Sequence, residues 1–132
     1  MLRFLIIEDD KIIRSIFKTL IKKKFQCTIF EADNGQTGLK ILQDKLPDIV
    51  FLDISMPVMN GIETLNIIRS NPSFKYIPVI MLTAISDKNI VNAFVEKGIS
   101  DYLLKPLDHD ATISRIQKVI SRINEKKQHT II

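Results

Sequence analysis

The sequence has a single cysteine, Cys27, no tryptophan and only four glycines among its 132 residues. One cysteine cannot close a disulfide within the chain, which excludes a disulfide-stapled scaffold and is typical of proteins from a reducing cytoplasm. Apolar stretches long enough to span a membrane are also missing, and the first residues do not resemble a signal peptide. Zinc-type Cys/His spacings and glycine-rich phosphate loops are absent as well. We therefore expect a cytoplasmic protein without a membrane segment.

Composition is ordinary for a globular domain, with 45% hydrophobic and 26% charged residues and a net charge of +4. A chain of this length fits one domain that can bury a core of its own. The positive charge is a mild bias, and we interpret the lysines at 22–24 and 126–127 as solvated helix ends. Direct contact with nucleic acid is therefore not expected.

Strand and helix patterns alternate from one end of the chain to the other. Short apolar runs typical of buried parallel strands occupy residues 4–7, 49–53 and 78–82, and two more polar strands are predicted at 27–30 and 101–105. Helical spacing of apolar residues follows each strand, first over residues 11–24, where Asp10 is placed to cap the helix. This alternation predicts an α/β fold of the (βα)5 type with a parallel sheet and right-handed crossovers. We assign residues 1–124 to the domain and 125–132 to a polar tail that we expect to be frayed.

Asp53 comes at the end of an apolar run and is followed at once by the turn signals Pro57 and Gly61. It should therefore lie at the carboxyl end of a buried strand, and in open α/β sheets that rim is where ligands bind. Other strands end on functional residue types too: Glu8 and Asp9 after the first, Thr83 after the fourth and Lys105 after the fifth. Singly, each has an ordinary explanation as a cap, a turn or a surface residue, but together they predict a site.

Clustered carboxylates at that rim need a cation. Two like charges a few ångströms apart repel by roughly a few kcal/mol at intermediate dielectric, and Lys105 supplies only one positive charge. Carboxylate oxygens with water and a backbone carbonyl suit Mg²⁺, which often binds beside phosphate. The residues alone thus predict an acidic Mg²⁺ pocket around Asp53.

Residues 5–10, 51–61, 78–84 and 101–107, with the order and spacing of their motifs, resemble the receiver domain of bacterial two-component response regulators. The resemblance covers almost the whole chain. It implies a doubly wound, flavodoxin-like sheet with strand order 2-1-3-4-5. It also implies a phosphorelay module that accepts a phosphoryl group from a sensor histidine kinase or a phosphotransfer protein and is not an enzyme with a separate substrate.

Carried over to this sequence, the resemblance makes Asp53 the phosphoacceptor. Asp9, Asp53 and the backbone carbonyl of Ser55 would ligate Mg²⁺, for which Mn²⁺ could substitute, and Glu8 would hold a metal-bound water. Thr83, Ala84 and Lys105 would contact the phosphoryl group, Thr83 and Tyr102 would form the switch, and the bond before Pro106 would be cis.

Alternatives exist for several of these interpretations. Tyr102 is also explained as a half-buried strand tyrosine. His109 and His129 raise the idea of a histidine phosphotransfer protein, but neither lies on an apolar helix face. A phosphatase with an aspartyl nucleophile would need a second acid two residues after Asp53, where Ser55 stands. A flavodoxin-like cofactor binder would need hydroxyl or glycine donors after the first strand instead of acids.

The helix expected around residues 86–98 carries more apolar residues than one buried stripe needs, so part of it should face a partner. We expect activation to alter the surface formed by this helix, the fifth strand and the last helix. Receiver domains that dimerise through this face use charge pairs, for which Arg115 and Lys118 are candidates, although Ser100 replaces an acid often present there. The resemblance also implies that Ser55 and Ile85 border the approach of water to Asp53. Ser55 is too short and Ile85 too apolar to orient that water, which predicts slow loss of the phosphoryl group, unless Ile85 merely packs against the neighbouring helix. The downstream effector or output domain is not identified by the sequence.

Overall fold

The computed structural model describes the backbone of residues 1–56 and 58–131, and the side chains of these residues as far as Glu125. Pro57, which served above as a turn signal, and the side chain of His129 lie outside the described residues. Within the described part, none of the helices combines the length and the apolar character that crossing a membrane requires.

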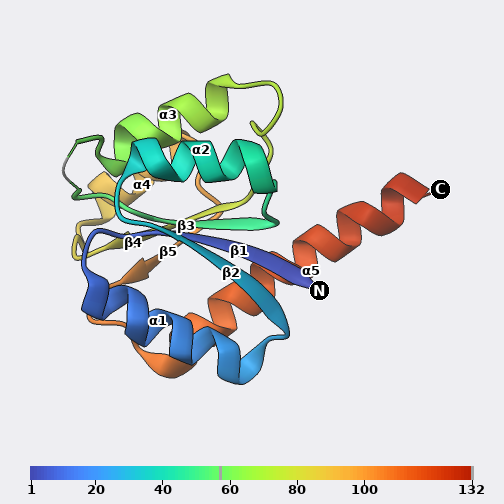
Figure 1. Ribbon diagram of the computed structural model, residues 1–132, viewed down its shortest axis with the longest axis horizontal. Coiled ribbons are helices and arrows are strands. Elements are labelled where there is room, and N and C mark those ends of the chain that lie inside the picture. The colour runs from blue at the N-terminus through green and yellow to red at the C-terminus, as the bar shows by residue number, and fades with distance from the viewer. Residues whose placement is uncertain (57, 132) are drawn as a thin grey trace.

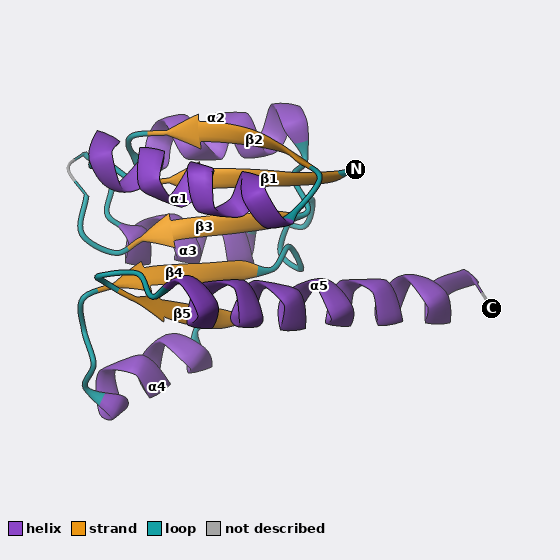
Figure 2. Cartoon of the chain, turned by 90° about the horizontal axis from the view of Figure 1, so that it is seen from below, coloured by secondary structure: helices purple, strands orange, loops and turns teal. Residues whose placement is uncertain are grey.

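Strands and helices alternate as the sequence predicts, and the parallel sheet has the order β2-β1-β3-β4-β5 (Figures 1 and 2). Each neighbouring pair runs parallel, so all strand carboxyl ends meet at one rim. The fold is therefore the doubly wound, flavodoxin-like (βα)5 arrangement. Its elements are β1 (Leu2–Ile7), α1 (Lys11–Lys24), β2 (Cys27–Ala32), α2 (Gly35–Lys45), β3 (Ile49–Asp53), α3 (Gly61–Ser70), β4 (Val79–Thr83), α4 (Lys88–Glu96), β5 (Asp101–Leu104) and α5 (His109–Ile131).

Helices cover both faces of the sheet, with α1 and α5 on one side and α2, α3 and α4 on the other (Figure 1). Successive strand residues point to opposite faces, so β1 contributes Phe4 and Ile6 to the α1–α5 core and Leu5 and Ile7 to the other. This explains why the central strands read as continuous apolar runs. Every residue of β3 and β4 is buried.

Side-chain caps fix where the helices begin, as expected for α1. The Asp10 carboxylate accepts hydrogen bonds from the backbone N–H groups of Ile12 and Ile13. Equivalent caps come from Asn34 at α2, Asn60 at α3 and Asp87 at α4. Each cap directly follows a loop that leaves the rim of the sheet, so the caps also set the course of these loops.

Helix α1 buries only part of its apolar residues. Phe17, Leu20 and Ile21 pack into the core, whereas Ile12 and Ile16 are 71% and 57% exposed. An apolar cleft of 450 Å³ opens beside this end of the helix, lined by Ile13, Ile16, Lys105, Pro106 and Leu107.

Several strand and helix ends differ from expectation by one or two residues, and two further differences, at β2 and α5, concern how far these elements continue. Strand β2 continues past Phe30 to Ala32, because Glu31 points outward and forms ion pairs with Arg14 and Lys18 while its backbone stays in register with β1. The frayed tail expected after Asn124 is wrong, since α5 continues to Ile131 and projects beyond the sheet (Figure 2). Residues 125–128 have high helix propensity, which favours continuation of the helix there.

Candidate functional site

Asp53 is the last residue of β3, and its side chain is almost completely buried at the centre of the rim. The chain turns back immediately behind it, because the N–H of Gly61 donates to the carbonyl of Ile54 at 2.8 Å. A Cβ at position 61 would collide with the Asp53 carbonyl oxygen, so only glycine lets α3 begin this close. The Asp53 carboxylate is thus held by a fully buried strand and a tight return of the backbone.

Glu8 and Asp9 reach the same point from the end of β1. Carboxylate oxygens of Glu8, Asp9 and Asp53 all lie within 4.8 Å of one another. Glu8 is fully buried, and the N–H of Glu8 donates to the Ala32 carbonyl at 3.0 Å, which ties the end of β1 to β2. Asp9, by contrast, is exposed at the mouth of the cluster.

Lys105 joins this cluster from the loop after β5. Its Nζ donates hydrogen bonds to Glu8 Oε1 at 2.8 Å and to Asp53 Oδ1 at 3.0 Å. The peptide bond between Lys105 and Pro106 is cis, the geometry that the resemblance implies. Lys105 therefore lies beside the acidic residues, as the sequence predicts.

Burial and neighbouring charges shift the pKa values of Glu8, Asp9 and Lys105. Burial, followed by the neighbouring Asp53, raises the pKa of Glu8 to about 8, and the same two influences raise the pKa of Asp9. For Lys105, burial opposes the charged form, but the hydrogen bonds that its ammonium donates to Glu8 and Asp53 outweigh burial and raise the pKa. Burial and the neighbouring Asp53 therefore disfavour the charged forms of Glu8 and Asp9, and Lys105 offsets this only in part.

These side chains fit a divalent cation. Glu8 Oε2 is buried and has no hydrogen-bond partner among the described residues, an arrangement that is unfavourable unless a cation or its water shell satisfies it. The N–H of Ser55 lies 3.4 Å from Asp53 Oδ1, so its backbone borders the same carboxylate. Carboxylate and carbonyl oxygens are hard ligands of the kind that Mg²⁺ prefers.

Thr83 ends β4 next to Asp53 and is buried. Its Oγ1 accepts a hydrogen bond from the N–H of Ile85 at 2.9 Å, which leaves the hydroxyl hydrogen free to donate. Ala84 is exposed, and Ile85 is half-buried. At the end of β4 the rim therefore carries the Thr83 hydroxyl, followed by the apolar side chains of Ala84 and Ile85.

Tyr102 lies one strand further out, on β5, opposite Met81 of β4. It is half-buried against the α4 side of the core and does not belong to the acidic cluster. His109 is exposed at the start of α5, next to Asp110, and is therefore not part of the site. Cys27, the first residue of β2, is half-buried.

The sequence did not reveal the contacts that the side chains of Arg14 and Arg115 make. Arg14 donates to the backbone carbonyl of Glu8 at 2.8 Å and also bonds Glu31. Its place one turn into α1, where side chains point back toward the helix start, is a signal that could have found it. Arg115 is paired with Asp101 of its own chain, and no local sequence pattern announces that pairing.

Comparison with known proteins agrees with this arrangement. Residues 4–117 match the family model described as the response regulator receiver domain. The chain is 35% identical over 119 residues to the chemotaxis protein CheY of Listeria monocytogenes, covering 89% of this chain and 98% of that protein. It is also 35% identical over 124 residues to the DNA-binding transcriptional regulator NtrC of Escherichia coli, but that match covers 93% of this chain and only 26% of NtrC.

Solved structures show the same fold. The receiver domain of the Francisella response regulator 1452 superposes with a TM-score of 0.85 at 28% identity, covering 93% of this chain and 99% of that domain. A response regulator of Chloroflexus aurantiacus gives a TM-score of 0.84 at 26% identity, covering 90% of this chain and 97% of that one. The chain belongs to the receiver domain family of two-component response regulators.

Proposed function

We propose that this chain accepts a phosphoryl group on Asp53 from the phosphohistidine of a sensor kinase or phosphotransfer protein. The observation that carries the proposal is the convergence of a buried Asp53 with two further acids and Lys105 at the rim of the sheet. In the transfer, an Asp53 oxygen forms the new bond to phosphorus while the bond from phosphorus to the donor nitrogen breaks. The electron pair of the broken bond stays on the donor imidazole.

Each neighbour has a defined part in this step. Lys105 already bonds Asp53, so its ammonium is placed to neutralise the phosphoryl oxygens, and the free hydroxyl hydrogen of Thr83 can donate to one of them. The small, exposed Ala84 leaves the approach open. Asp9, Asp53 and the Ser55 carbonyl would hold Mg²⁺, or Mn²⁺ in its place, with Glu8 bonding a metal-bound water. Bound there, the ion would supply positive charge against the carboxylates and the phosphoryl group.

The phosphorylated state then changes the surface formed by α4, β5 and α5. In this proposal the phosphoryl group draws Thr83 inward and Tyr102 turns into the space that opens, a shift between two populations. Exposure of Ile90 and Val95 supports a partner surface on α4, since both are apolar and remain uncovered in this chain.

The working unit of the proposal is residues 1–124, acting in the cytoplasm on protein partners, without direct contact with nucleic acid or membrane. It takes part in signalling and turns over no separate substrate, apart from slow loss of its own phosphoryl group. The effector or fused output domain that reads the switched surface is left open.

Incubation with acetyl phosphate and Mg²⁺, followed by intact mass measurement, tests the proposal. We expect the wild type to gain one phosphoryl group, Asp53→Asn to gain none, and Asp44→Asn to behave as wild type, because Asp44 is exposed on α2 away from the rim. Continuous release of phosphate without a stable adduct would indicate a phosphatase instead. No adduct and no turnover would favour a binding module of another kind.

A further inference from the structure

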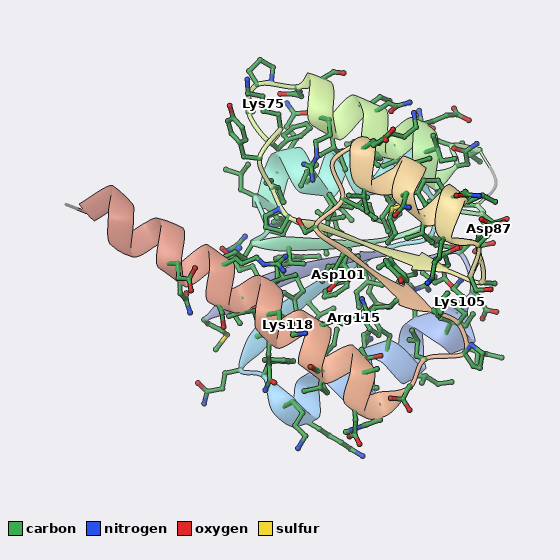
Figure 3. All side chains as sticks on the ribbon, turned by 180° about the vertical axis from the view of Figure 1, so that it is seen from behind. Lys75, Asp87, Asp101, Lys105, Arg115 and Lys118 are labelled. Carbon is green, nitrogen blue, oxygen red and sulfur yellow. The ribbon has the colours of Figure 1, made fainter. Side chains whose placement is uncertain are left out.

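Arg115 contacts two neighbours at the open edge of the sheet. Its guanidinium donates to Asp101 Oδ1 at 2.6 Å, and the guanidinium carbon lies 4.9 Å from the centre of the Tyr102 ring. Figure 3 shows Asp101 and Arg115 close together, with Lys118 further along α5. Arg115 is thus engaged within its own chain instead of offering a free charge to a second copy.

The contact joins the two faces of the sheet. Tyr102 packs on the α4 side, whereas Leu103 packs on the α5 side, so Asp101 and Tyr102 point to opposite faces. Because β5 is an edge strand, no further strand blocks the path, and Arg115 reaches around the edge from α5 to both residues. The N–H of Tyr102 also donates to Asp101 Oδ1 at 2.8 Å, which makes the group of Asp101, Tyr102 and Arg115 a closed set of contacts.

Tyr102 is only partly enclosed, because it packs half-buried against the core and also borders a cavity. A cavity of 200 Å³ adjoins it, lined by Tyr102, Leu103, Leu104, Pro106, Asp108, Ala111, Thr112 and Arg115. A side chain beside such a space has room to change rotamer, so specific contacts decide its position more than the surrounding volume does. The stacking of the Arg115 guanidinium on the Tyr102 ring is such a specific contact. A planar guanidinium stacks on an aromatic ring better than an ammonium group does.

We propose that Arg115 is a positioning residue that clamps Tyr102 in the resting position, so that phosphorylation of Asp53 must displace the ring from it. This Arg115 clamp rests on the proposed function, since it requires Tyr102 to move when the acidic site is occupied. Any contact made only in the resting state lowers the population of the competent state. It therefore weakens binding of a phosphoryl mimic by the same factor.

The size of that factor follows from the contact. An exposed cation–π pair is worth about 0.5–1 kcal/mol, which corresponds to roughly a two- to fivefold change in an equilibrium constant. The measurement is the affinity for beryllofluoride in the presence of Mg²⁺, made on the full chain. Arg115→Ala removes the clamp, and Lys40→Ala, as the matched control, removes a cation from an exposed position of α2, outside the surface formed by α4, β5 and α5.

A second readout follows the ring directly. The chain has two tyrosines, and Tyr76 is 80% exposed, so fluorotyrosine labelling gives a ¹⁹F signal for Tyr102 and an internal reference from Tyr76. Arg115→Lys keeps the charge but loses the planar group, and Asp101→Asn weakens the ion pair while keeping the arginine. These variants separate charge from stacking and replace Arg115→Ala if that chain does not fold.

We expect Arg115→Ala to bind beryllofluoride about two- to fivefold more tightly and to shift the unliganded Tyr102 signal toward its liganded position in wild type. Lys40→Ala should change neither. Unchanged or weaker affinity in Arg115→Ala, with an unmoved Tyr102 signal, overturns the clamp and leaves the proposed function intact so long as wild type binds beryllofluoride. Failure of wild type to bind beryllofluoride overturns both.

Discussion

Strands β3 and β5 both carry residues of the site, yet they are packed very differently. Every residue of β3 is buried between helices on both faces, whereas β5 is fully buried only at Leu103. Asp53 therefore lies on a fully buried central strand, while Tyr102 lies on an edge strand next to a cavity. We infer from this difference that phosphoryl transfer takes place at the centre of the sheet, whereas the conformational change takes place at its edge.

Helix α4 belongs with the edge. Only Val91 and Phe94 are buried, and Figure 2 shows the helix lying beyond β5 at the open edge of the sheet. Its far end is held through Arg69 of α3, whose Nε donates to the Gly98 carbonyl at 2.9 Å. Elements with few buried side chains open most easily, so α4 and β5 are the parts of this fold best suited to change.

A matched pair of truncations should show this difference most strongly. Leu52 on β3 is fully buried and Leu104 on β5 is 41% exposed. Leu52→Ala should lower the free energy of unfolding by about 2–5 kcal/mol, and Leu104→Ala by less than about 1 kcal/mol. Urea unfolding of both variants checks this, and similar losses would remove the contrast between centre and edge.

Metal binding should stabilise the centre of the sheet next most strongly. A ligand that binds only the folded state adds roughly 2.7 kcal/mol when it is about a hundredfold above its dissociation constant. Millimolar Mg²⁺ should raise the melting temperature of wild type, and Asp9→Ala should abolish the rise. An equal rise in both proteins would speak against Asp9 as a ligand.

In the metal-free protein, the free energy of unfolding should depend on pH through Glu8 of the acidic cluster. The carboxyl of Glu8 has a pKa raised from 4.5 to about 8, so between these values the folded state keeps a proton that the unfolded state releases. Stability of the metal-free protein should therefore fall as pH rises through this window and level off above it. The pKa of Glu31 is lowered by Lys18, so its effect falls below 4.5, outside the window.

Urea unfolding in a chelator at several pH values measures the slope. Glu8→Gln should flatten it, whereas Glu31→Gln should leave it as in wild type. A slope that persists in Glu8→Gln would assign the titration to another group.

Loss of the phosphoryl group is the smallest effect expected. Ile85 is half-buried beside Thr83 and cannot orient an attacking water, so Ile85→Glu should speed the decay of phosphorylated Asp53 several-fold. Decay is followed by intact mass after the phosphodonor is removed. Equal decay rates in wild type and Ile85→Glu would mean that Ile85 only packs against its neighbours.

Much of the fold could be predicted because local signals agreed with one another. Apolar runs marked β1, β3 and β4, and acids, a threonine and a lysine at the strand ends marked the rim. The extent of β2 was missed because Glu31 interrupts its apolar pattern, and only the ion pairs with Arg14 and Lys18 explain its place. The length of α5 was missed because polar residues can extend a helix without an apolar face to reveal it.

The contacts of Arg115 and Arg69 with distant elements could not be predicted from the sequence. Arg115 was considered for charge pairs between copies, but the structure pairs it with Asp101 and Tyr102 of its own chain. The four hydrogen bonds from Arg69 to backbone carbonyls of Lys75, Ile77 and Gly98 likewise depend on how α3 packs beside α4. Such contacts follow from the packing of whole elements, which no local residue pattern records.

Hydrogen exchange with and without beryllofluoride and Mg²⁺ tests the division between centre and edge most directly. The account predicts that α4 and β5 change their exchange rates strongly on binding, while the buried amides of β1 and β3 stay protected in both states. A change spread evenly over the sheet, or none at α4 and β5, would contradict it.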